Sequence, residues 1–166
     1  LDKNNKLYKV SILPRTGSLG VTVSVPLEEN INYNKTELSN MIKILFGGRI
    51  AEEIFFDEIT TGASNDIERA NDIIEKMIKE WGMSYLGLLN IKDTYERKYS
   101  ENLLEKVDEM KKRMLFENYQ KAKELLIENK DFVQNMAKLL LEKEEIEFYQ
   151  IEEIYHQLCT IKLCHS

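Results

Sequence analysis

The sequence predicts a mostly α-helical α+β protein, with a small N-terminal β element and a C-terminal helical bundle. Two short runs rich in alternating and β-branched apolar residues occur near the N-terminus. From residue 38 onward, apolar residues recur at helical spacing. The 166 residues are 43% apolar and 31% charged, which suits a folded domain with a sizeable core rather than a disordered chain.

The β element is predicted from residues 8–12 and 19–25, which flank a Gly-containing loop. Runs of β-branched residues around such a loop are typical of a hairpin or a small sheet. Pro14 and Pro26 have no amide hydrogen to donate, so we expect these strands to lie at a sheet edge.

The first helix is predicted to begin at Asn34, whose side chain can accept from a first-turn amide while Glu37 reaches back. Its apolar stripe covers residues 38–55 and passes through Gly47 and Gly48. Each glycine costs a helix about 1 kcal/mol relative to alanine, so we expect another backbone to approach closely there. The alternative is a helix break at the glycine pair.

The stretch TTGASND, residues 60–66, ends in a carboxylate, Asp66, where a second helix is predicted to begin. With about 100° between successive residues, Asp66 lies at the border of the apolar stripe of that helix. A first-turn carboxylate meets unpaired amides and the positive end of the helix dipole, and such an oriented oxygen can bind zinc. First-turn aspartates are also common as solvated helix caps, so both interpretations stay open.

Residues 92–100 are polar and predict a linker between a first part, residues 1–91, and a helical part, residues 101–166, of the same domain. The charged runs of the second part are predicted to be solvated faces, with subunit contact as the alternative. Cys159 and Cys164 lack the spacing of zinc-binding pairs, which favours a frayed tail in a reducing compartment over a metal clip.

Composition and missing motifs exclude several classes of function. The net charge of -6 gives no basic stripe for nucleic acid. The chain has no G-x-x-x-x-G-K-[ST] stretch for nucleotide phosphates, and no histidine precedes His156. The carboxylates that remain for a site in the first part are Glu52, Glu53 and Asp66, and these form at most part of one.

Several stretches resemble the protease domain of the FtsH family, the membrane-anchored, ATP-dependent zinc metalloproteases. The most specific are LFGGRIAEEIFF at 45–56 and TTGASNDIERAND at 60–72, separated by the interval found in the family. KEWGMS at 79–84 and the stretch over 107–133 extend the resemblance. KVSILPRTGSLGVTV at 9–23 is similar to the strand pair of the same domain.

The resemblance implies that Asp66 is the third protein ligand of a zinc ion. In the family, an H-E-x-x-H helix supplies the two histidine ligands and the glutamate that acts as general base. That helix lies just N-terminal to the strand pair, and this sequence begins at Leu1, so we expect it upstream of these residues. ATP and magnesium are expected only through an ATPase module that these residues do not contain.

The resemblance also implies roles for the residues around the zinc. It implies that a substrate chain adds to an edge strand formed by Leu19, Gly20, Val21, Thr22 and Val23. The alternative is that these residues form an ordinary strand of the sheet with no role in binding substrate. Supporting or structural roles near the metal fall on Glu52, Glu53, Gly47, Gly48 and Asn65.

We therefore expect part of a zinc metalloendopeptidase that degrades unfolded and membrane-derived proteins, with these residues inactive alone. The resemblance implies a homo- or hetero-hexamer anchored to a membrane by an N-terminal segment, with this domain in the bacterial cytoplasm or an organelle interior. A non-catalytic assembly module of such a hexamer is the main alternative. An unrelated helical binding domain is a second alternative, and it predicts Asp66 facing solvent, away from Glu52 and Glu53.

Overall fold

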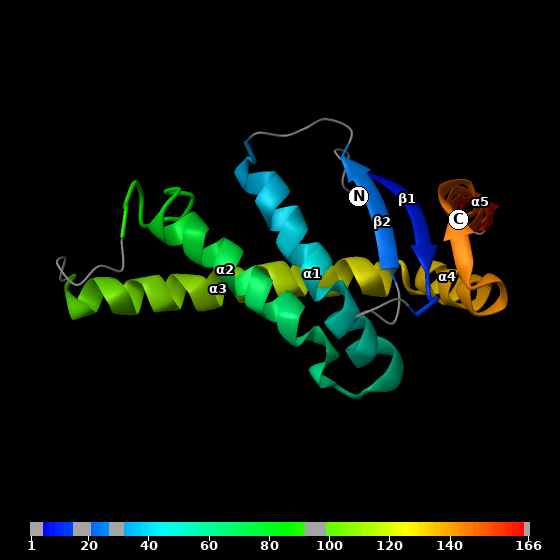
Figure 1. Ribbon diagram of the computed structural model, residues 1–166, viewed down its shortest axis with the longest axis horizontal. Helices are drawn as coiled ribbons and strands as arrows, with labels where there is room; N and C mark the ends of the chain where they lie inside the picture. The colour runs from blue at the N-terminus through cyan, green and yellow to red at the C-terminus, as the bar shows by residue number, and fades with distance from the viewer. Residues whose placement is uncertain (1–4, 15–20, 27–31, 92–98, 165–166) are drawn as a thin grey trace. The chain divides into compact units, whose positions relative to one another are not determined.

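The computed structural model describes residues 5–14, 21–26, 32–91 and 99–164 (Figure 1). The chain divides into two compact units. Leu1–Asn32 and Glu128–Ser166 form the first, called the sheet unit here, and Tyr33–Ile127 form the second, called the helical unit. The helices and the small antiparallel sheet confirm the predicted mostly helical α+β class. The predicted linker falls largely outside the described residues, so the division at 92–100 stays a prediction.

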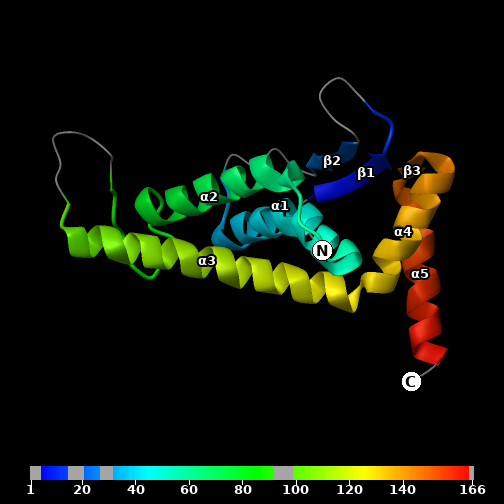
Figure 2. The same ribbon diagram turned by 90° about the horizontal axis from the view of Figure 1, so that it is seen from below.

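The sheet unit contains three antiparallel strands in the order β2-β1-β3. Its strands are β1 (Asn5–Ser11), β2 (Val21–Pro26) and β3 (Glu145–Glu147), and its helices are α4 (Lys130–Lys143) and α5 (Phe148–Cys164). Figure 2 shows α4 and α5 side by side, and both helices contact β3. The first two strands were predicted from the sequence, and the third was not.

The register makes β1 the central strand. Val10 lies opposite Thr22 on one side and Ile146 on the other. The side chain of Ile146 is fully buried, and Lys9 forms an ion pair with Glu145 at 3.0 Å. Because β2 pairs only with β1 among the described residues, it is an edge strand of the described sheet, as predicted from Pro26. The edge position predicted for the first strand is wrong, because β1 pairs with β2 on one side and with β3 on the other.

The helical unit consists of α1 (Lys35–Phe56), the 3-10 turn η1 (Thr61–Ala63), α2 (Ser64–Lys79) and α3 (Glu101–Glu128). The predicted cap of α1 is confirmed, because the Asn34 side chain accepts from the amides of Thr36 and Glu37. The Glu37 carboxylate accepts in return from the Asn34 amide at 2.7 Å. This reciprocal pair satisfies first-turn amides and fixes where α1 begins.

Apolar side chains from all three helices form the core of the helical unit. Full burial of such a side chain contributes about 1.5 to 3 kcal/mol. The buried members on the helices are Leu38, Ile42, Phe46, Ile50, Ala70, Ile74, Met77, Ile78, Val107, Met114 and Ala122. Ile67 of α2 and Trp81, which follows the helix, lie outside this core and are 39% and 43% exposed.

Helix α1 passes through Gly47 and Gly48 without interruption. The alternative of a helix break is therefore wrong. A Cβ atom placed on either glycine would have no neighbour within 4 Å, so the close backbone approach that we expected is not supplied by the described part of the chain. This face of α1 is open among those residues.

Candidate functional site

Asp66 is the third residue of α2 and is half-buried. The residue before the helix is Ala63, which provides no side-chain cap. Within the described ranges, the Asp66 carboxylate forms no hydrogen bond or ion pair with another residue. A capping carboxylate accepts a hydrogen bond from a first-turn amide. The described residues show no such bond for Asp66, so they give it no capping role.

The Asp66 loop, residues 57–66, is held by Glu52 of α1. One Glu52 oxygen accepts from the Thr60 hydroxyl at 2.6 Å, and the other accepts from the Thr60 amide at 3.2 Å. The Thr60 hydroxyl oxygen in turn accepts from the Gly62 amide at 3.2 Å and begins η1. These bonds fix the backbone six and four residues before Asp66, at Thr60 and Gly62. The supporting role near a metal that the sequence predicts for Glu52 stays a prediction.

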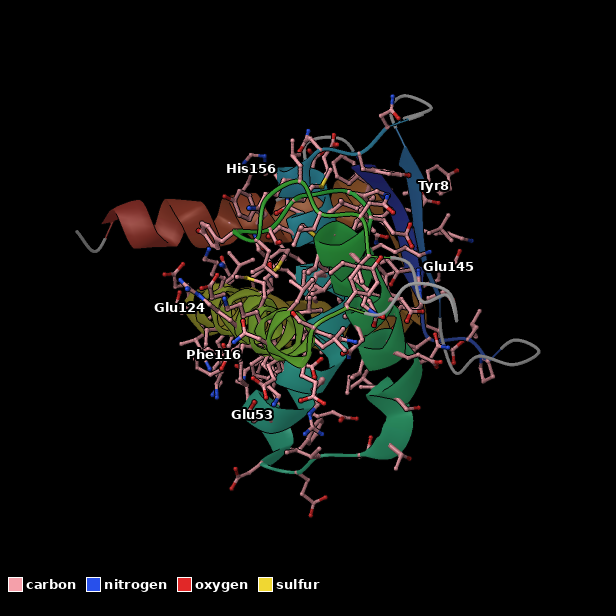
Figure 3. All side chains as sticks on the ribbon, turned by 90° about the vertical axis from the view of Figure 1, so that its left-hand side faces the viewer. Tyr8, Glu53, Phe116, Glu124, Glu145 and His156 are labelled. Atoms are coloured by element: carbon pink, nitrogen blue, oxygen red, sulfur yellow. The ribbon has the colours of Figure 1, made fainter. Side chains whose placement is uncertain are left out.

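Glu53, which is labelled in Figure 3, forms hydrogen bonds with side chains of α3. The Tyr119 hydroxyl donates to one of its oxygens, and the Lys123 ammonium donates to the other at 2.6 Å. The Tyr119 ring also packs edge-on against the buried Phe46 ring, with centroids 5.5 Å apart. Glu53 thus ties α1 to α3, while Glu52 ties α1 to the Asp66 loop.

Hydrogen bonding keeps both glutamates ionised at neutral pH. The Thr60 hydroxyl, then the Thr60 amide, lowers the pKa of Glu52. The Lys123 ammonium, then the Tyr119 hydroxyl, lowers the pKa of Glu53. Arg49 adds a smaller favourable charge near both carboxylates. Neither carboxylate is therefore poised to take up a proton near neutral pH, which suits supporting roles better than acid-base chemistry.

Four residues that bond or lie near these glutamates were not predicted from the sequence: Arg49, Thr60, Tyr119 and Lys123. Thr60 had a local signal, because a threonine two residues before a glycine at a helical turn is a common cap. Tyr119 and Lys123 of α3 had no local sequence signal, because they lie 66 and 70 positions after Glu53 in the chain. Only the folded arrangement brings these groups together.

The remaining predicted site residues lie in varied positions. Asn65 is exposed in the first turn of α2. Thr22 is exposed on β2, the edge strand of the sheet unit. Leu19 and Gly20 lie outside the described residues, as do His165 and the side chains of the two cysteines. The predicted role of residues 19–23 in binding substrate and the supporting roles predicted for Gly47, Gly48 and Asn65 therefore stay predictions.

The described residues offer no complete metal site around Asp66. Among them, no three His, Cys, Asp or Glu side chains gather closely enough to hold a metal ion. A zinc ion in a catalytic site takes three protein ligands and one water, so Asp66 would need two further ligands.

No helix in the described part of the chain is both long and apolar enough to cross a membrane.

Comparison with known proteins identifies close relatives of the chain. The sequence model of Peptidase family M41 matches residues 1–154. The "ATP-dependent zinc metalloprotease FtsH" of Pelodictyon phaeoclathratiforme is 37% identical over 91% of this chain and 25% of its own length. The protein of the same name from Aquifex aeolicus is 41% identical, over 93% of this chain and 27% of its own. The chain thus spans about a quarter of the length of these curated relatives.

Proposed function

Because this chain belongs to peptidase family M41 and is similar to the FtsH zinc metalloproteases, we propose that Asp66 is a protein ligand of a catalytic zinc ion. One observation carries the proposal: a half-buried carboxylate on an anchored loop has no partner of its own among the described residues. Leaving such a group without a partner is unfavourable unless a cation or a donor completes its surroundings. A zinc ion is the cation that the names of the relatives supply.

The chemistry at this site is hydrolysis of a peptide bond. A zinc ion held here would supply Lewis-acid polarisation of the scissile carbonyl and would make an attacking water more acidic. Asp66 contributes an ionised oxygen held by the first turn of α2, and Glu52 fixes the loop that aims it. The histidine ligands and the general base are proposed to belong to an H-E-x-x-H helix, which the 166 residues do not contain. These residues alone are therefore expected to be inactive.

The proposal extends to the whole protein. The described edge position of β2 supports a substrate chain adding to residues 19–23 by backbone hydrogen bonds, which hold a polypeptide whatever its sequence. Unfolded and membrane-derived proteins are the substrates proposed, with ATP and magnesium acting in a separate module. A membrane-anchored homo- or hetero-hexamer, with this domain in the bacterial cytoplasm or an organelle interior, remains the proposed setting.

The test compares two variants of the intact protein that contains this chain. Asp66→Asn is expected to lower zinc affinity by at least about tenfold, because losing even an outer-shell group costs that much, and to reduce peptidase activity with it. ATP hydrolysis is expected to persist. Asp72→Asn is the matched control, since Asp72 is an exposed aspartate on the same helix. Zinc content is measured on the purified proteins.

Equal zinc content in Asp66→Asn and the unmodified protein would contradict the proposal. The non-catalytic assembly module would then account better for the chain, since it predicts that Asp66 and Asp72 are equally dispensable for metal binding. Loss of zinc in both variants would instead show a general effect on folding. Circular dichroism of each variant identifies that outcome.

A further inference from the structure

Two neighbouring glutamates on α1 hold different parts of the helical unit. Glu52 and Glu53 are consecutive residues, so their side chains leave the helix about 100° apart. Glu52 bonds the Asp66 loop through Thr60, and Glu53 bonds α3. The C-terminal end of α1 is thus fixed from two sides by carboxylates that follow one another in the sequence.

The attachment of Glu53 to α3 is built to be rigid. Both of its oxygens are occupied, one by a neutral hydroxyl and the other by an ammonium group. The side chains of Lys123 and Glu53 are 29% and 32% exposed, so solvent screens this pair only in part. Packing of Tyr119 against Phe46 holds the hydroxyl in place from the core side.

We propose that Tyr119 and Lys123 of α3 are positioning residues for the candidate metal site. By holding Glu53 they fix the end of α1, and the adjacent Glu52 passes this restraint to the Asp66 loop. The inference rests on the proposed function of Asp66. It adds that the geometry of the metal ligand depends on a helix that does not touch it, and that α3 is therefore part of the zinc-binding apparatus.

The restraint that α3 places on the Asp66 loop passes through few interactions: the hydrogen bonds of Glu53, the backbone of α1 and the hydrogen bonds of Glu52. A helix of hydrogen-bonded turns moves as a unit over one or two residues, so a displacement of Glu53 displaces Glu52. Thr60 bonds Glu52 through its hydroxyl and its amide, and its hydroxyl also accepts from Gly62. A Cβ at Gly62 would lie only 3.3 Å from the Thr60 hydroxyl oxygen, which shows how closely this turn is packed.

Hydrogen exchange of the intact protein tests the proposal. Lys123→Met keeps the apolar stem while removing the charge, and Tyr119→Phe keeps the ring against Phe46. Each variant is expected to speed amide exchange in the Asp66 loop by about threefold, the size expected from losing a partly exposed charged hydrogen bond. Zinc release to a chelator is expected to accelerate by a similar factor. Lys123→Arg is expected to restore both measurements.

Lys111→Met is the matched control. Lys111 lies on the same helix and also makes an ion pair across to another helix, with Glu75 of α2 at 2.8 Å. Its loss removes an α3 contact of the same chemistry without touching Glu53. Exchange in the Asp66 loop is expected to stay unchanged in this variant. Faster loop exchange in Lys111→Met would show a general loosening and would overturn the assignment.

A double variant separates transmission through Glu52 from other routes, which spatial proximity alone cannot do. Once Glu52→Ala has removed both bonds to Thr60 and released the loop, adding Lys123→Met is expected to cause no further increase in loop exchange. Additive effects, or an unchanged loop in Lys123→Met and Tyr119→Phe, would sink the positioning role. Either result would leave the proposed zinc ligand intact, because that proposal fails only if Asp66→Asn retains its zinc.

Discussion

Asp66 and Glu75 lie on the same helix, α2, but their carboxylates have opposite surroundings. Glu75 accepts from Lys79 at 2.7 Å and from Lys111 at 2.8 Å. Hydrogen bonds from Lys111 and then Lys79 lower the pKa of Glu75 to about 2. Asp66 is half-buried and has no such partner among the described residues. The carboxylate of Glu75 is therefore held by two ammonium groups, whereas the carboxylate of Asp66, at the start of α2, has no such partner in the described part of the chain.

The difference separates structural carboxylates from a candidate ligand. Glu52, Glu53 and Glu75 each have both oxygens occupied by donors of the protein itself. A carboxylate whose two oxygens already accept hydrogen bonds is a poor candidate for a metal ligand. Asp66 retains its full capacity as an acceptor, at a helix start where anionic groups are favoured. The number of hydrogen-bond donors that each of these four carboxylates already has therefore distinguishes structural carboxylates from a candidate metal ligand.

The largest expected effect tests the stable end of α2. Ile74→Ala is expected to lower the free energy of unfolding by about 2 to 5 kcal/mol, because Ile74 is fully buried in the core and its loss leaves a cavity. Ile67→Ala, one residue after Asp66 and 39% exposed, is expected to cost less than about 1 kcal/mol. Denaturant unfolding measures both. Equal losses would mean that the two ends of α2 contribute alike.

An intermediate effect is expected for the charge cluster. Glu75→Gln is expected to lower the free energy of unfolding by about 0.5 to 1 kcal/mol at neutral pH, since its side chain is 36% exposed and solvent weakens its ion pairs. Its folded pKa lies below the ordinary value of 4.5. Its contribution is therefore present above pH 4.5 and is lost as pH falls toward 2.

Unfolding measured at several pH values checks this prediction. The difference in stability between the unmodified protein and Glu75→Gln should shrink between pH 4.5 and about 2. Glu68→Gln is the control, because Glu68 is exposed on the same helix. A pH-independent difference would show that Glu75 acts through packing rather than charge.

Local signals account for the parts of the fold that the sequence predicted. The Asn34 cap, the stripes of α1 and α2 and the first two strands each depend on residues a few positions apart. Strand β3 has only three residues and depends on pairing with β1, across 136 positions from Lys9 to Glu145. The bonds of Glu53 are likewise made by distant residues. Asp66 was proposed as a ligand from its motif, whereas the hydrogen bonds that hold its loop could be identified only from the fold.

The smallest expected change in stability falls on the residue with the largest expected functional role. In metal-free protein, Asp66→Asn is expected to alter the free energy of unfolding by no more than about 0.5 kcal/mol. The lost attraction to the helix dipole is offset by the easier burial of a neutral amide. A loss as large as that of Glu75→Gln, measured by the same unfolding titration, would place Asp66 among the structural carboxylates. Stability without zinc retention would instead mean that the fold carries this carboxylate for the metal alone.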